Sequence, residues 1–176
     1  TVINQAGGSI VSTDATGVLF FTGGSVTNTG NGSLISGGFR GIGIQGGAGT
    51  VTNSGGASIT AVDMGIYLDR GGTVTNGTGS SISGSTGIYG NWLDGFTPAQ
   101  AMTLTNSGLI TGTSGLAIDF ENGGTVTNQA GGGLTGAAGG ALIWGGVLTN
   151  TGSGSKIVGN NGIGVDFEDS GTVTNS

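Results

Sequence analysis

The tetrapeptide Thr50-Val51-Thr52-Asn53 recurs along this chain of 176 residues and decides its fold. The Asn residues of successive copies are 22 to 30 residues apart, and 8 of the 13 Asn residues of the chain occupy this one position. Self-similarity at such a period indicates stacked structural repeats. Near-copies stand at residues 1–4, 25–28, 73–76, 103–106, 125–128, 147–150 and 172–175.

Each repeat contains two further apolar segments, so we expect three strands per coil, a coil being one repeat. The short segments centre on Ile10, Leu34, Ile59, Ile82, Leu109, Leu134 and Ile157. The longer ones are residues 18–20, 42–44, 66–68, 88, 116–118, 142–143 and 163–165. Apolar residues alternate with polar or small ones, as in a strand with one buried face.

A single repeat is too small to bury its apolar face, whereas stacked repeats form one continuous core. The sequence therefore predicts an all-β fold: a single parallel, right-handed β-helix over residues 1–176, with about seven coils of 22 to 25 residues. At about 4.8 Å per coil, seven coils span about 34 Å.

The repeated Asn predicts an internal ladder of stacked amides. If Val51 points inward, Asn53 turns inward at a corner, where Asn tolerates a left-handed backbone and amides can bond along the stack. The alternative is an ordinary turn residue facing water. The expected ladder consists of Asn28, Asn53, Asn76, Asn106, Asn128 and Asn150.

Composition excludes several classes of function. The chain has no Cys and no His, so thiol nucleophiles, imidazole bases and structural zinc sites are not available. Three cationic residues against nine carboxylates leave a net charge of −6, which argues against a nucleic-acid partner. We expect no cofactor, no metal and no catalysis.

The sequence has 44 Gly, a single Pro and no apolar run long enough for a membrane span. It also has no secretion signal at Thr1, so we expect any such signal to lie outside this segment or to have been removed. The segment resembles a slice of a longer solenoid, whose uncapped terminal coils would tend to pair end to end.

Residues 49–55 (Gly-Thr-Val-Thr-Asn-Ser-Gly) and 171–176 (Gly-Thr-Val-Thr-Asn-Ser), with the short Gly-Ile segments between repeats, resemble the passenger repeats of bacterial autotransporters. The resemblance covers essentially the whole chain. It implies a large surface protein of a Gram-negative bacterium, exported through an outer-membrane barrel that these residues do not include. It also implies an adhesive or aggregating role, with partners on a host surface, on a neighbouring cell or on like solenoids.

Paired threonines suggest a different function. Outward Thr-x-Thr pairs would form two files, about 6.6 Å apart across a strand and about 4.8 Å apart along the axis, similar to the arrays of β-solenoid antifreeze proteins. Thr is also a common choice for the exposed face of any strand. The candidate ice-binding residues are Thr50, Thr52, Thr73, Thr75, Thr103, Thr105, Thr125 and Thr127.

The longest coil predicts an inserted surface loop over residues 91–102. Trp92 and Phe96 in this loop, with outward Tyr67 and Tyr89 nearby, could contact a sugar or a partner surface. The alternative is a loop whose aromatic side chains pack over their own coil. If the loop binds a partner, replacing Trp92 and Phe96 with Ala should reduce adhesion without unfolding the protein.

The carboxylates gather after the third strand of each coil. Asp69, Glu121 and Glu168 share one repeat position, which Ile143 should occupy in the coil next to Glu121. Carboxylates two coils apart are separated by about 9.6 Å, too far to share one calcium ion, so we expect a solvated acidic edge. The sequence therefore favours a non-catalytic, surface-displayed adhesive stalk, with ice binding or fibre assembly through the solenoid ends as alternatives.

Overall fold

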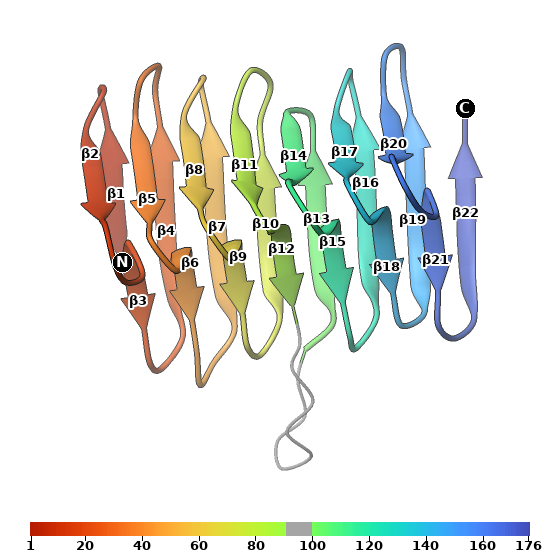
Figure 1. Ribbon diagram of the computed structural model, residues 1–176, viewed down its shortest axis with the longest axis horizontal. Coiled ribbons are helices and arrows are strands. Elements are labelled where there is room, and N and C mark those ends of the chain that lie inside the picture. The colour runs from red at the N-terminus through yellow and green to blue at the C-terminus, as the bar shows by residue number, and fades with distance from the viewer. Residues whose placement is uncertain (91–99) are drawn as a thin grey trace.

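The computed structural model describes residues 1–90 and 100–176 and is a parallel β-solenoid of about seven turns with three strands per coil (Figure 1). Every strand pairs in parallel with the equivalent strand of the neighbouring coil, so the chain forms three sheets that run along the solenoid. The described residues include no helix, and therefore none that could span a membrane.

The first sheet carries the repeated tetrapeptide and has eight strands. They are β1 (Val2–Gln5), β4 (Gly24–Thr29), β7 (Gly49–Ser54), β10 (Gly72–Asn76), β13 (Met102–Asn106), β16 (Gly124–Gln129), β19 (Gly146–Thr151) and β22 (Gly171–Asn175).

The second and third sheets have seven strands each. The second consists of β2 (Ser9–Ser12), β5 (Leu34–Gly37), β8 (Ser58–Ala61), β11 (Ser81–Gly84), β14 (Leu109–Gly112), β17 (Gly133–Gly136) and β20 (Lys156–Gly159). The third consists of β3 (Val18–Phe20), β6 (Arg40–Ile44), β9 (Met64–Leu68), β12 (Thr86–Gly90), β15 (Leu116–Phe120), β18 (Gly139–Ile143) and β21 (Val165–Phe167).

The core is a column of apolar side chains, and each position in a coil stacks on the same position of the next. Val26, Val51 and Val74, for example, are equivalent residues of successive first-sheet strands and are fully buried. Two predicted core positions in the second sheet are wrong by one residue. The register aligns Ile35 and Ile110, rather than Leu34 and Leu109, with Ile59 and Ile82. Where two apolar residues are adjacent, the length of the preceding corner decides which one faces inward.

Met102 is a second correction, because it belongs to a strand and not to the expected loop. It is the first residue of β13 and is fully buried. Its partners in neighbouring first-sheet strands are Gly72 and Gly124. Gly90, in turn, stands where other third-sheet strands have Leu68 and Phe120, and a Cβ on Gly90 would collide with the Met102 side chain. Met102 thus fills the volume that Gly90 leaves open.

Candidate functional site

The internal corner after each tetrapeptide holds a continuous ladder of asparagine amides. Asn28 Nδ2 donates to Asn53 Oδ1 at 2.9 Å, and Asn53 Nδ2 donates to Asn76 Oδ1 at 2.9 Å. The same bond joins each consecutive pair from Asn4 to Asn175. The amides from Asn4 to Asn150 also donate to backbone carbonyls at the corner, as Asn53 does to Ala57 and Ser81. A buried polar group bonded in this way stabilises the corner at little desolvation cost.

The outer face of the first sheet carries two threonine columns in register. One column begins at the half-buried Ser25, runs through the exposed Thr50, Thr73, Thr103 and Thr125, and continues through Val147 to Thr172. The other runs through seven consecutive coils and is half-buried in all of them except the last, where Thr174 is exposed. It consists of Thr27, Thr52, Thr75, Thr105, Thr127, Thr149 and Thr174.

The outer face of the third sheet brings Tyr67 and Tyr89 together. They are paired residues of adjacent strands, and their rings stack with centroids 5.8 Å apart and planes 7° apart. The Arg40 guanidinium lies 3.8 Å from the centre of the Tyr67 ring. Both tyrosines point away from the core, yet each is only 8% exposed. The faces of Tyr67 are therefore occupied by protein groups and are not open for a sugar to stack on. Trp92 and Phe96 lie outside the described residues.

The phenol groups of this stack bond to carboxylates of the third sheet. Tyr67 Oη donates to Asp69 Oδ1 at 2.9 Å, and an ion pair of 3.4 Å joins Arg70 Nε to Asp69 Oδ2. Burial, with the hydrogen bond to Asp69, raises the pKa of Tyr67 to about 12. Burial and a hydrogen bond to Glu121 also raise the pKa of Tyr89. Both phenols therefore stay protonated over the physiological pH range.

Asp119 and Arg40 on this face each have a buried polar atom that lacks a hydrogen-bond partner among the described residues. Asp119 follows Tyr89 in the outward row, and its buried atom is Oδ1. Burial, and the nearby charge of Glu121, raise the pKa of Asp119 to about 6. Asp119 is thus partly protonated near neutral pH.

Of the carboxylates expected after the third strands, Asp119 and Asp166 instead lie within β15 and β21. Asp69, Glu121 and Glu168 each come directly after the last residue of their strand. In the coil between Glu121 and Glu168 that position holds Trp144, whereas Ile143 is paired with Phe120 and is buried. The corner after β18 is one residue shorter than the corner after β15. Counting back from Asn150 by the same number of residues as from Asn128 to Glu121 therefore reaches Ile143 instead of Trp144. Within residues 1–90 and 100–176, no group of three acidic residues is arranged to hold a metal ion.

A recess on the outer surface was not foreseen from the sequence, and it arises from one shortened corner. Four residues (77–80) separate Asn76 from β11, and four (129–132) separate Asn128 from β17. Only Ser107 and Gly108 separate Asn106 from β14. In Figure 1 the turn between β13 and β14 accordingly projects less far than the turns on either side. We call Ser107–Gly108 the short corner.

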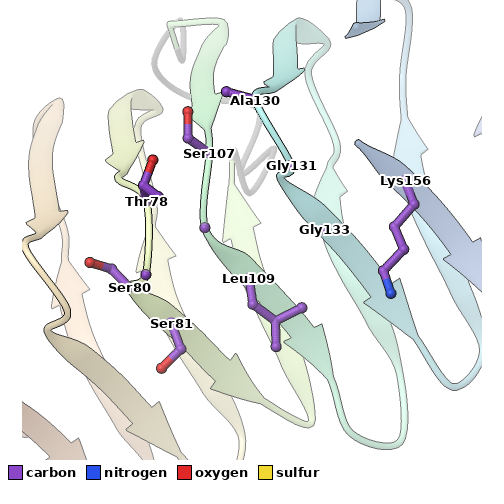
Figure 2. A pocket seen from close by; sticks show the side chains of 11 residues that line it. Thr78, Ser80, Ser81, Ser107, Leu109, Ala130, Gly131, Gly133 and Lys156 are labelled. Carbon is purple, nitrogen blue, oxygen red and sulfur yellow. The ribbon is translucent and has the colours of Figure 1, made fainter. Parts of the chain in front are cut away.

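The longer corners on both sides of the short corner enclose a recess of about 600 Å³ (Figure 2). Its floor contains Leu109, which is 45% exposed, and Gly133, and the exposed Lys156 side chain reaches toward it from the next strand. The lining residues are Thr78, Gly79, Ser80, Ser81, Ser107, Gly108, Leu109, Ala130, Gly131, Gly133 and Lys156. The 22-residue spacing from Asn106 to Asn128 signals a shortened coil, but it does not show which corner is short.

Comparisons with protein-family models, with curated proteins and with solved structures found no match for this chain.

Proposed function

We propose that this chain is a rigid, surface-displayed segment of an exported bacterial adhesin, which presents its outer faces to a host surface or to a neighbouring cell. The observation that carries the proposal is the unbroken register of the three sheets around the asparagine ladder. Such a column holds outward side chains at fixed spacing over its whole length. The likeness of the repeats to autotransporter passengers supports the same role, and we propose that it acts without catalysis.

Adhesion of coated beads tests this function. Because the chain has no Cys, one cysteine added at a terminus couples it to beads in a single orientation. We expect such beads to adhere to epithelial monolayers several-fold more than beads carrying Ile66→Asp, which places a charge in the core. Soluble wild-type protein should compete. Clumping of the beads themselves would instead report binding between like solenoids.

Equal adhesion of wild-type and Ile66→Asp beads would overturn the proposal, provided that circular dichroism shows β-structure in the wild type and its loss in the variant.

Ice binding is the second candidate, and the seven-residue threonine column favours it. We propose that the two threonine columns would order water on a flat face of repeated hydroxyl and methyl groups. Thr75→Tyr with Thr127→Tyr should then abolish thermal hysteresis. A matched control, Ser83→Tyr with Thr135→Tyr, places two tyrosines at the same two-coil separation on the second sheet and should leave hysteresis intact. Wild-type protein without hysteresis would dispose of this candidate.

A further inference from the structure

The short corner leaves a backbone donor without the acceptor that three of its equivalents have. At three of the longer corners, the third residue after the ladder Asn donates its backbone N–H to a serine hydroxyl of the next coil. Gly7 N donates to Ser33 Oγ at 3.1 Å, Gly56 N to Ser80 Oγ at 3.1 Å, and Gly131 N to Ser155 Oγ at 3.2 Å.

Gly79 occupies the same position in its corner, with a φ of 75° against 79°, 84° and 84° for Gly7, Gly56 and Gly131. Its N–H therefore points toward the next coil in the same way. That coil contains the short corner and has no serine at the receiving position. Among the described residues Gly79 N has no acceptor, so this N–H faces the recess.

Other groups around the recess are also hydrogen-bond donors. The hydroxyls of Thr78 and Ser107 have no protein partner in the described ranges, and Lys156 contributes an ammonium group. No carboxylate lines the recess, although the chain carries nine carboxylates against three cationic residues. A site with this charge balance favours an anionic ligand over a cation.

The floor of the recess adds an apolar contact. Gly133 has no side chain, and a Cβ placed there would lie 3.1 Å from Leu109 Cδ1 and 3.7 Å from Lys156 Cε. Leu109 and Lys156 therefore flank an open position in the outward row of the second sheet. Sugars combine an apolar C–H face with a rim of hydroxyls, and a volume of about 600 Å³ is in the range of small-molecule sites.

We propose that this recess binds one acidic sugar unit of a glycan, a sugar that carries a carboxylate or a sulfate group. Lys156 receives the anionic group at one end of the recess, the Gly79 N–H and the hydroxyls of Thr78 and Ser107 bond the sugar hydroxyls at the other end, and Leu109 packs against the C–H face between them. The proposal rests on the adhesive function above and names the partner chemistry for it. A single charge and few hydrogen bonds give a Kd of about 1–10 mM for one sugar unit, and repeated display raises the avidity.

Amide NMR of the full chain tests the site directly. Glucuronic acid and glucose 6-sulfate should each shift the Gly79 amide resonance saturably, whereas glucose should bind at least tenfold more weakly. Lys156→Gln should weaken binding of the acidic sugars at least tenfold. Gln5→Glu is the matched control, because it changes the net charge by the same amount on an exposed side chain of β1 and should leave binding unchanged.

A corner graft gives a second variant. Replacing Ser107-Gly108 with Gly-Thr-Gly-Ser, the sequence of residues 77–80, should rebuild a full corner, supply the missing serine for Gly79 and fill the recess. Unchanged thermal stability with binding abolished is the expected result.

Three results would overturn the proposal: no shift of Gly79 by either acidic sugar at about 50 mM, equal shifts by inorganic sulfate, or binding that survives the graft. If the acidic sugars do not bind but the protein-coated beads still adhere to the monolayers, the adhesin proposal stands and only the sugar site is rejected. Sugar binding without bead adhesion would instead retain the site and reject the adhesive function.

Discussion

The asparagine corner and the outer face of the third sheet use the same repeat register with opposite results. Inside, one residue type recurs in every coil, and each amide from Asn4 to Asn150 donates to the next. Outside, paired positions hold Tyr67, Tyr89, Asp119, Leu142 and Asp166 in successive coils. The interior is constrained because each residue is the hydrogen-bond or packing partner of its copies. The exterior is free to vary, so specific recognition belongs there.

The largest expected effect comes from breaking the ladder. Asn76→Ala removes the acceptor for Asn53 Nδ2 and the donor for Asn106 Oδ1 in a buried corner. We expect a loss of about 3–5 kcal/mol in the free energy of unfolding, measured by denaturant titration. Asn161→Ala, at an exposed corner, is the control and should change stability by less than about 0.5 kcal/mol. A similar loss in both variants would contradict a special role for the ladder.

Gly90 and Met102, which share one volume of the core, give a second test of how tightly the interior is constrained. Met102→Gly should cost about 3–4 kcal/mol because it opens a cavity beside Gly90. Adding Gly90→Leu recreates the Leu68 and Gly72 arrangement of the preceding coil, and should recover most of that loss. Gly90→Leu alone should destabilise the protein, because the new side chain overlaps Met102. Additive losses in the double variant would show that the two positions do not share one volume.

On the outer face, removing a buried charge should stabilise the protein. The pKa of Asp119 in the folded state, about 6, lies above its ordinary value of 3.8, so folding favours the protonated form. The ionised form therefore lowers stability above about pH 6, and this cost disappears below about pH 4. After allowance for solvent screening, Asp119→Asn should gain about 1 kcal/mol at pH 7. Thermal unfolding at pH 7 and at pH 3.5 checks this, and an equal gain at both values would contradict it.

The smallest expected effect is the coupling between Arg40 and Tyr67. A double-mutant cycle with Arg40→Met and Tyr67→Leu should give a coupling energy of about 0.5–1 kcal/mol from the cation–π contact. Denaturant unfolding of the four proteins measures this energy. Zero coupling would mean that the guanidinium is held there only by packing.

The solenoid was predictable because its signal is repeated in every coil. The tetrapeptide and the two apolar segments of each repeat specify three strands per coil, and their recurrence specifies that each strand stacks on the equivalent strand of the next coil. The inward orientation of the repeated Asn follows from its position two residues after an inward-facing Val. Features that occur once were not predictable. Leu109 or Ile110 could each face inward until the length of the short corner was known, and Trp144 rather than Ile143 aligns with Glu121 because one corner is a residue shorter. The recess depends on one such corner between two longer ones, so a period measured from Asn to Asn does not locate it.

A substitution scan of outward and ladder positions in a surface-displayed chain, scored for both folded display and adhesion, tests the central claim most directly. We predict that substitutions in the asparagine ladder reduce display and adhesion together. Substitutions around the short corner, Lys156→Gln and Leu109→Ala among them, should reduce adhesion while display stays at the wild-type level. If adhesion falls only where display falls, and no outward position separates the two, then the claim that the variable exterior carries recognition is wrong.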